Sequence, residues 1–465
     1  MLRDAKVKIP GRFLSRLRRI LPKGSLLVDS ADRWSYGYDN SRHHASPDVV
    51  AFPVDVQQVQ ACVRLCDEFN VPIVARGRGT GTTGASVPVR GGLVLSMERM
   101  ARILVMDPAN RVMVVEPGVT NQEVQDAAAV HGFFWPPDPS SATFCTVGGN
   151  LACNSAGPHA IKYGTTRENT LGLQVVIGTG DIVHTGVYTT KGVVGYDLTR
   201  LIIGSEGTLA VITEAILKLT PLPESRRILR AVYADMESTA AAVIRVMTQA
   251  VTPCALEMID GQAIEMIRSY SRVVLPRSAG GLLMIEVDGP GAGLDEATAR
   301  IMAAARGAGL LELNSAATKD EADALWAARK ALSPALRTVA PKKINEDVVV
   351  PISCMAELIA GLRRLGAEHG ITIVNFGHAG NGNIHVNLMV DPDNPAQMIE
   401  AERCLDKVFD LVLNLGGTLS GEHGVGILKR NFINREIDPL TLNLMRKIKA
   451  TFDPHGILNP DKIFP

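Results

Sequence analysis

The first half of the chain alternates between helix-like and strand-like patterns of apolar residues. Residues 54–70 carry apolar side chains every three or four positions, which predicts an amphipathic helix. Short apolar runs at residues 71–75 and 93–100 predict two strands, and a glycine-rich stretch separates them. Residues 111–120 predict a further strand that ends in a Pro-Gly turn, and residues 121–132 predict a helix.

Two prolines, Pro221 and Pro223, mark the clearest candidate domain boundary. Before them, residues 170–186 predict a hairpin and residues 201–223 a buried strand. After them the pattern predicts helices at residues 238–250, 295–309, 320–336, 354–370 and 401–417, strands at residues 281–289 and 344–352, and a hairpin at residues 371–390. We therefore expect an α+β second domain with an antiparallel sheet.

Composition limits the classes of function. The chain has 465 residues, enough for about two or three domains, and 46% hydrophobic residues, enough for large cores. Lysine plus arginine equals aspartate plus glutamate at 48 each, and this neutrality argues against nucleic acid as a partner. The cysteines are scattered and form no CxxC pair, which indicates free thiols: Cys62, Cys66, Cys145, Cys153, Cys254, Cys354 and Cys404.

The N-terminal segment at residues 3–24 is basic and amphipathic. It is compatible with a transit peptide or a membrane-surface helix, but we favour an ordinary first helix with a solvated basic face. No run of 18 or more apolar residues is present, so the sequence predicts no membrane span.

A glycine-rich loop contains the first candidate binding motif. Gly79, Gly81 and Gly84 spell GxGxxG, the spacing of a dinucleotide-binding turn. An NAD-binding Rossmann unit needs a helix directly after the loop, and Pro88 would break that helix. The bare amides can instead wrap a pyrophosphate without a helix dipole, and an ordinary surface turn remains the alternative.

A second loop of small residues follows at residues 134–157. Pro136, Pro137 and Pro139 exclude regular structure at its start, and Gly148 and Gly149 open a run of small side chains. Such a run indicates backbone packed close against a large flat ligand.

His378 and His385 are the strongest candidates for metal chemistry. They lie seven residues apart around a glycine-rich turn of the predicted hairpin, so both rings can converge. Strand alternation places Asn383, His385 and Asn387 on one face. Histidines that are merely hydrogen-bonded within the sheet are the alternative interpretation.

Glu422 and His423 form a second candidate pair, placed between Gly421 and Gly424. The flanking glycines let the backbone aim both side chains at one point. Two imidazoles and a carboxylate can bind a divalent ion and leave positions open for a substrate. The spacing does not match the HExxH helix of a zinc protease.

Arg329, Ser333 and two lysines are candidates for binding a carboxylate. Ser333 lies one turn after Arg329 on the predicted helix, while Lys342 and Lys343 precede the predicted strand at residues 344–352. An arginine can hold a carboxylate through two parallel hydrogen bonds. On spacing alone, a solvated helix face and charges at a strand end are favoured.

These motifs occur in one order, and together they resemble the FAD-linked oxidases of the vanillyl-alcohol-oxidase type. The glycine loop, "TVGGNLACNSAG", "IGSEGTLAVITE" and "GHAGNGNIHVN…GEHGVG…FDPHGILNPDKIF" carry the resemblance, which covers residues from about 40 to the end. Within this type the chain is similar to the D-2-hydroxy-acid dehydrogenases: D-lactate dehydrogenase, D-2-hydroxyglutarate dehydrogenase and the flavin subunit of glycolate oxidase.

The resemblance implies an α+β protein with a two-subdomain FAD-binding domain at residues 1–222. A substrate or cap domain would follow at residues 223–450, and a tail at residues 451–465 would return to the FAD-binding domain. FAD would contact Arg76, Gly77, Arg78, Gly79, Thr80, Gly81, Thr82, Gly84, Pro137, Asp138, Thr146, Gly149, Asn150, Asn154, Gly157, Ile212 and Asn459. No histidine lies between Val71 and Gly92, so we expect non-covalent FAD, and we interpret Cys145 as structural.

The resemblance also implies roles in catalysis. In metal-dependent members, the positions of His378, His385 and Glu422 hold a zinc-like divalent cation. His423 would be the base, Arg329 the carboxylate clamp and Asn387 a substrate contact, with Lys343 and Ser333 as further substrate contacts. A lysine of the metal-dependent relatives falls at Asn345 here, with Lys343 two residues earlier, which leaves that role open.

The implied reaction oxidises a D-2-hydroxy acid to the 2-oxo acid by hydride transfer to flavin N5. D-Lactate, glycolate and D-2-hydroxyglutarate remain open as substrates, and Arg337 with the two lysines could favour a second carboxylate. The electron acceptor would be a quinone, a cytochrome or an electron-transfer flavoprotein, and a homodimer is compatible with the resemblance. The expected location is the bacterial cytoplasm or the mitochondrial matrix, with peripheral membrane contact open.

Two alternatives from other classes remain at this point: a zinc hydrolase that uses the histidines alone, and a non-catalytic flavin-binding subunit of a larger complex. A closer relative, an aryl-alcohol oxidase, is disfavoured because it would need no metal or carboxylate site.

Overall fold

The computed structural model describes residues 9–270, 274–336 and 340–465, and these residues form two compact units. The first unit comprises Met1–Ala156, Gly164–Leu222 and Glu422–Pro465, and the second comprises Gly157–Tyr163 and Pro223–Gly421. The main part of the first unit therefore ends at Leu222, where the prolines predict a boundary. Its last segment begins at Glu422, ahead of residue 451, from which the returning tail was expected.

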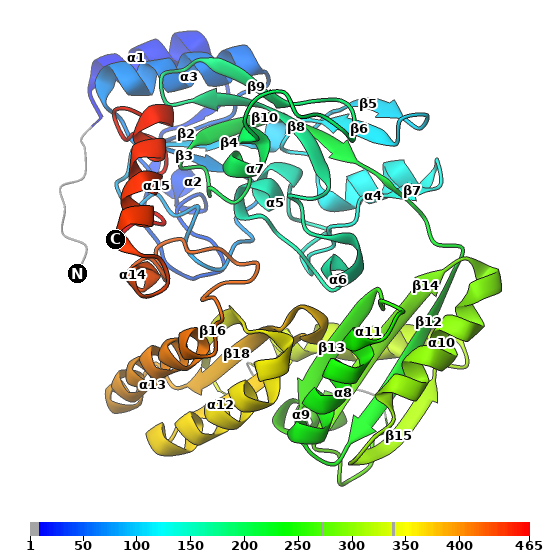
Figure 1. Ribbon diagram of the computed structural model, residues 1–465. Helices are drawn as coiled ribbons and strands as arrows, with labels where there is room; N and C mark the ends of the chain where they lie inside the picture. The colour runs from blue at the N-terminus through cyan, green and yellow to red at the C-terminus, as the bar shows by residue number, and fades with distance from the viewer. Residues whose placement is uncertain (1–8, 271–273, 337–339) are drawn as a thin grey trace. The chain divides into compact units, whose positions relative to one another are not determined.

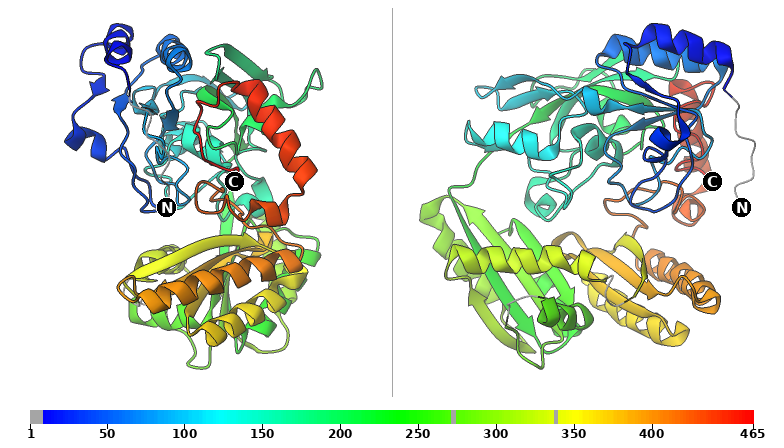
Figure 2. Two further views of the ribbon diagram at one scale, coloured as in Figure 1. Left: turned by 90° about the vertical axis from the view of Figure 1, so that its left-hand side faces the viewer. Right: turned by 180° about the vertical axis from the view of Figure 1, so that it is seen from behind.

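Helix α3 (Val56–Phe69) opens the glycine-loop region of the first unit as the sequence predicts. The Asp55 side chain accepts a hydrogen bond from the Gln58 amide at 2.8 Å, and the helix ends at Asn70 in the left-handed conformation. Helix α1 (Gly11–Ile20) lies beside α3 (Figures 1 and 2) and buries Phe13 and Leu17. The basic N-terminal segment thus contains an ordinary core-packed helix.

A four-stranded sheet carries the glycine loop. Its order is β1-β2-β4-β3, with β2 and β3 both parallel to β4. The strands are β1 (Leu26–Leu27), β2 (Val49–Ala51), β3 (Ile73–Arg76) and β4 (Leu93–Ser96). The loop between β3 and β4 contains no helix, because Gly79 and Gly84 adopt positive φ and the chain turns directly into β4. The Rossmann alternative is therefore excluded by the local topology.

A five-stranded antiparallel sheet forms the other part of the first unit, in the order β5-β6-β10-β8-β9. Its strands are β5 (Ile103–Asp107), β6 (Val112–Val115), β8 (Thr170–Ile177), β9 (Ile182–Gly186) and β10 (Ala210–Lys218). The prediction of one strand over residues 201–223 was wrong in extent. Helix α7 (Leu198–Ile202) and a turn precede β10, since Gly204 and Gly207 adopt positive φ.

Helices α4 (Asn121–Ala129), α5 (Val147–Cys153) and α6 (Ala160–Tyr163), with the short strands β7 (Phe133–Phe134) and β11 (Thr220–Pro221), complete this region. The short helix α2 (Ser30–Trp34) precedes β2. Thr120 and Glu123 form a capping box that begins α4.

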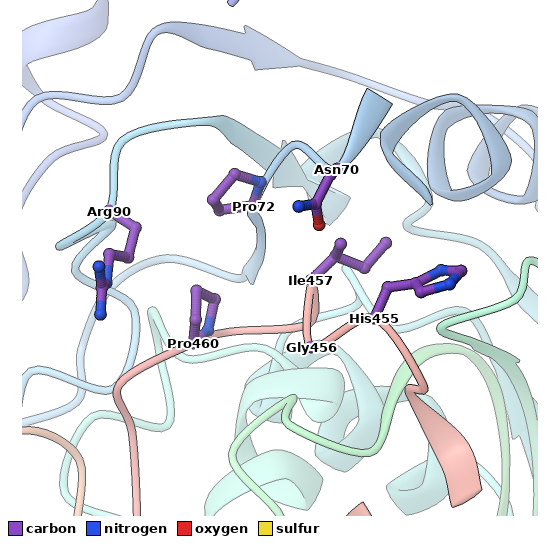
Figure 3. Close-up of a pocket in the computed structure, with 7 residues that line it drawn as sticks. All are labelled: Asn70, Pro72, Arg90, His455, Gly456, Ile457 and Pro460. Atoms are coloured by element: carbon purple, nitrogen blue, oxygen red, sulfur yellow. The ribbon is translucent and has the colours of Figure 1, made fainter. Parts of the chain in front are cut away.

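The C-terminal segment returns to the four-stranded sheet of the first unit. After α14 (Ile433–Glu436) and α15 (Pro439–Phe452), the Ile73 amide donates to the Ile457 carbonyl, and the Asn459 amide donates to the Ile73 carbonyl, both at 2.8 Å. Figure 3 shows Ile457 and Pro460 beside Pro72 and Asn70. The Lys462 ammonium donates to the Val87 carbonyl at 2.8 Å. The tail thus completes the sheet edge at the glycine loop.

The second unit is built on a seven-stranded antiparallel sheet in the order β15-β12-β14-β13-β17-β18-β16, as expected for an antiparallel second domain. The strands are β12 (Ser225–Tyr233), β13 (Ala255–Asp260), β14 (Gly281–Gly289), β15 (Leu310–Ser315), β16 (Lys342–Val349), β17 (Thr372–His378) and β18 (Asn383–Val390). Lys342 and Lys343 begin β16 rather than precede it, because they pair with Val390 and Met389.

In the part of the second unit that the structure describes, six long helices cover this sheet: α8 (Met236–Thr248), α9 (Gly261–Tyr270), α10 (Gly291–Ala305), α11 (Lys319–Ala335), α12 (Met355–His369) and α13 (Pro395–Asn414). Ile264 of α9 and Leu332 of α11 pack in one core cluster with Ile259, Met284 and Phe376 of the sheet. Helices α12 and α13 lie side by side along β17 and β18 (Figure 1). Within the described residues, no helix is both long and apolar enough to cross a bilayer.

Candidate functional site

His378 and His385 come together in the second unit, as the hairpin predicts. Strand β17 ends at His378, Gly382 turns the chain with φ of 71°, and β18 carries His385. The two rings meet edge to face with centroids 5.2 Å apart, and one ring nitrogen of each lies within 4.8 Å of the other. Both side chains are largely buried. The pair is therefore suited to share one metal ion.

A buried carboxylate fixes the ring of His378. Glu257 lies directly opposite His378 on the neighbouring strand β13, and its Oε1 is 2.5 Å from Nδ1 of the imidazole. Burial acts to raise the pKa of Glu257, but the charges of His378 and Arg329 outweigh it and lower the pKa to about 2. With Nδ1 donating to this carboxylate, a metal ion bound by His378 would be coordinated through Nε2.

The same carboxylate holds Arg329. Nε and Nη2 of Arg329 each lie 2.7 Å from Oε2 of Glu257, and the guanidinium lies 4.7 Å from the centre of the Phe376 ring. Helix α11 thereby presents the arginine to the strand end that carries His378. Arg337, a further candidate, lies outside the described residues.

The other predicted substrate contacts are engaged within the sheet and on α11. Asn387 is fully buried; its Oδ1 accepts from Asn345 at 2.6 Å, and its Nδ2 lies 3.0 Å from the Val374 carbonyl. The Lys343 ammonium donates to the Ser333 hydroxyl at 2.7 Å. These bonds order the face of the sheet next to His385.

Glu422 and His423 belong to the first unit, in a loop fixed by the glycine-loop region. The Thr83 hydroxyl donates to the His423 carbonyl at 3.2 Å. Glu206 accepts from the amides of Val425 and Gly426 at 2.6 and 2.8 Å. Burial raises the pKa of Glu206 to about 7, although those amides oppose the rise. The predicted base therefore sits on a loop anchored beside the predicted pyrophosphate site.

Glu422, the third predicted metal ligand, belongs to the first unit, whereas His378 and His385 belong to the second. Gly421, the last residue of the second unit, donates its amide to Asp347 at 2.8 Å, and Asp347 lies opposite His385 in the strand register. Glu422 is the next residue in the chain. The combination of Glu422 with His378 and His385 stays a prediction.

Most predicted FAD contacts lie in the first unit, and several have unused polar groups. The loop residues from Arg76 to Gly84 connect β3 and β4. Neither the buried Oγ1 of Thr82 nor Oδ1 of Asn459 has a hydrogen-bond partner among the described residues. A Cβ on Gly77 would lie 2.4 Å from the Thr146 hydroxyl oxygen, so only glycine allows the loop to pack this closely against the start of helix α5. Unsatisfied buried groups and bare amides fit a polar pyrophosphate-containing cofactor.

The remaining predicted contacts occupy α5 and its surroundings. Thr146 is the N-cap of α5 and accepts from the Gly149 amide. Asn150 is buried within this helix, and Asn154 is its C-cap in the left-handed conformation. The Pro137 carbonyl accepts from Asn121 at 2.9 Å. Asp138 follows Pro137, Ile212 is buried on β10, and Gly157 belongs to the second unit. Cys145 is buried, and its structural role stays a prediction.

A surface pocket and a second cluster of possible metal ligands share no residue with the predicted FAD contacts or the histidine pair. The pocket of about 260 Å³ in Figure 3 is lined by Asn70, Pro72, Arg90, His455, Gly456, Ile457 and Pro460, which include no predicted FAD contact. His159, Cys254 and Glu286 approach one another within 4.8 Å in the second unit. However, Arg226 already pairs with Glu286, and burial raises the pKa of Cys254 to about 12, which disfavours a thiolate ligand.

Sequence reasoning missed Glu257 and Glu206. Glu206 lies in the "IGSEGTLAVITE" motif, so an acid between two glycines was its only signal. Glu257 follows an ordinary apolar run and lies 121 residues before its partner His378.

Comparison with known proteins identifies the family of the chain. Residues 222–463 match the family model "FAD linked oxidases, C-terminal domain", and residues 47–186 match "FAD binding domain". The chain is 39% identical over 436 residues to the glycolate oxidase subunit GlcD of Bacillus subtilis, covering 94% of this chain and 93% of that protein.

It is also 33% identical over 463 residues to the mitochondrial D-lactate dehydrogenase [cytochrome] of Arabidopsis thaliana, covering 98% of this chain and 81% of that protein. The structure of p-cresol methylhydroxylase with substrate bound matches with a TM-score of 0.79 at 17% identity, covering 97% of this chain and 96% of that chain. This last similarity supports the fold alone.

Proposed function

We propose that the chain, which belongs to the FAD-linked oxidases in the group of D-lactate dehydrogenase and glycolate oxidase GlcD, oxidises a D-2-hydroxy acid such as D-lactate to the 2-oxo acid. It has the vanillyl-alcohol-oxidase type of FAD-binding fold. His378, His385 and Glu422 hold a divalent cation, zinc being the best match to these ligands.

The observation that carries the proposal is the cluster of Arg329, His378 and His385 around Glu257 at one face of the second unit's sheet. The guanidinium of Arg329 retains N–H groups that can bind the substrate carboxylate. Ser333 and Lys343 extend the polar surface on the same side of α11 and β16. A neutral alcohol would gain little from such a surface, which disfavours an aryl-alcohol substrate.

His423 is the proposed base. An imidazole exchanges protons near neutral pH and can take the proton of the 2-hydroxyl group. Its backbone is held by Thr83 and, through the following amides, by Glu206. When bound, FAD supplies a two-electron acceptor and a divalent cation supplies Lewis acidity.

Reduced flavin must pass its electrons to a further carrier. One relative is named as a subunit and another carries the word cytochrome in its name, which supports a protein partner as acceptor. A quinone is the alternative acceptor. Glycolate and D-2-hydroxyglutarate stand as alternative substrates, because the residues beyond Arg329 do not distinguish among these acids.

Anaerobic mixing of the purified protein with a panel of D- and L-2-hydroxy acids tests the proposal. Bleaching of the flavin absorbance by D-acids and not by L-acids is the expected result. Bound flavin that no 2-hydroxy acid bleaches would favour a non-catalytic subunit. Absence of flavin absorbance in the purified, folded protein would favour a zinc hydrolase instead.

A further inference from the structure

Glu257 is placed between two groups that the proposed function assigns to different tasks. One carboxylate oxygen faces Nδ1 of His378 at 2.5 Å, and the other accepts two N–H groups of Arg329 at 2.7 Å. The carboxylate has no exposed surface, so neither contact is exchanged for water. Its strand position fixes this arrangement, because Glu257 and His378 are directly paired across β13 and β17.

We propose that Glu257 is a positioning residue that sets both the tautomer of His378 and the orientation of Arg329, so that metal binding and carboxylate recognition depend on one side chain. The inference rests on the proposed function, since it takes His378 as a metal ligand and Arg329 as the substrate clamp.

The chemistry requires a carboxylate at this position. His378 can coordinate through Nε2 only if Nδ1 carries the proton, and Nδ1–H then needs an acceptor. Arg329 also presents only donors. A carboxylate accepts from both sides at once, whereas an amide has one accepting oxygen and one donating nitrogen.

The side chain of Glu257→Gln can therefore satisfy only one of its two partners, His378 or Arg329. If the amide oxygen faces His378, the amide nitrogen meets the guanidinium of Arg329, donor against donor. If the oxygen faces Arg329, the amide nitrogen donates to Nδ1 and leaves the proton on Nε2, the wrong tautomer for a metal ligand. The side chain keeps its size in either case, so packing alone predicts little change.

The test measures zinc affinity of the FAD-loaded protein by competition with a chromophoric chelator. We expect Glu257→Gln to bind zinc about 10- to 100-fold more weakly, as found when carboxylates behind metal-bound histidines are replaced. Flavin content and the thermal midpoint serve as measures of intact folding. Asp260→Asn is the matched control: Asp260 is a buried carboxylate of the same strand that accepts from Asn375 and Ala263 instead of His378.

The outcomes separate the inference from the proposed function. Zinc affinity and KM for the 2-hydroxy acid that both equal the parent values in folded Glu257→Gln would overturn the positioning role, because the amide must lose either His378 or Arg329. The proposed metal site would be left standing. A parent protein that binds no zinc would overturn the metal assignment and the inference together. Should Glu257→Gln not fold, Glu257→Asp, which is one methylene too short to reach both partners, is measured instead. Zinc affinity and KM that are both unchanged in this variant overturn the positioning role.

Discussion

His378 and His385 face each other edge to face across a single hairpin, with ring centroids 5.2 Å apart. We expect His385→Ala to abolish stoichiometric zinc binding, because one imidazole and one carboxylate do not make a complete site. FAD should stay bound, since its predicted contacts lie mainly in the other unit.

Elemental analysis and the flavin spectrum measure the two ligands separately. His369→Ala is the matched control, because His369 lies in the same unit on α12 and pairs with Glu400. Zinc content at the parent level in His385→Ala would remove His385 from the site.

Removing the metal from the parent protein should stop the reaction and leave the FAD in place. A chelator such as EDTA is expected to stop flavin reduction by substrate, because the Lewis acidity of the cation is lost. The FAD spectrum should persist, because the predicted metal ligands are not predicted FAD contacts. Activity is then measured before and after zinc is restored. Full turnover in a sample that elemental analysis shows to be metal-free would defeat the assignment.

Replacing the predicted base should separate cofactor binding from chemistry. We expect His423→Ala to lower the rate of anaerobic flavin reduction by about 10²- to 10⁴-fold, the usual contribution of a general base. The protein should remain yellow, because the loop is held through backbone groups of His423, Val425 and Gly426.

His455→Ala provides the control, since His455 is a histidine of the same unit that pairs with Asp67. Stopped-flow absorbance gives the rate. A parent-like rate in His423→Ala would show that another group accepts the proton.

The carboxylate clamp can be tested by keeping its charge and changing its shape. Arg329→Lys retains a partner for Glu257 but loses the planar array of donors. We expect kcat/KM for the hydroxy acid to fall about 10- to 100-fold, from the ~1.5–3 kcal/mol that hydrogen bonds to charged groups contribute.

The corresponding hydroxy amide, which lacks the carboxylate, should lose much less activity. Lys330→Met, an exposed neighbour on α11, is the control. Equal losses for acid and amide would argue against a contact between Arg329 and the carboxylate.

Glu206 should make stability depend on pH. Its pKa rises from 4.5 to about 7 in the folded protein, so between these values the folded state holds a proton that the unfolded state has lost. The contribution to stability is therefore present below pH 4.5 and is lost as pH rises toward 7, by up to about 3 kcal/mol at ~1.36 kcal/mol per unit.

Glu206→Gln should remove this slope. Denaturant unfolding of both proteins between pH 4.5 and 8 measures it. Parallel pH profiles would mean that Glu206 titrates normally.

The sequence predicted local elements well where one signal dominated. The His378 hairpin followed from two β-branched runs around glycines, and α3 followed from its apolar spacing. Partners far apart in the chain could not be predicted, because the periodicity of apolar residues does not specify which strands pair or in which register. Glu257 and His378 pair over 121 residues, and Thr83 and His423 over 340.

The predicted site was likewise clearest where residues lie close in sequence. Strand β13 escaped detection because "ALEMID" is too short and too mixed to be distinguished from a buried helix segment. Lys343 and Ser333 lie on different elements, and no local pattern predicts the 2.7 Å hydrogen bond that joins β16 to α11.

The return of the C-terminal tail has a consequence for biosynthesis. Ile457 and Asn459 bond to Ile73, and Lys462 caps the Val87 carbonyl. The sheet edge at the glycine loop is therefore incomplete until residues 457–462 have been synthesised. A nascent chain can assemble the second unit before that point, so we expect FAD capture to wait for this segment.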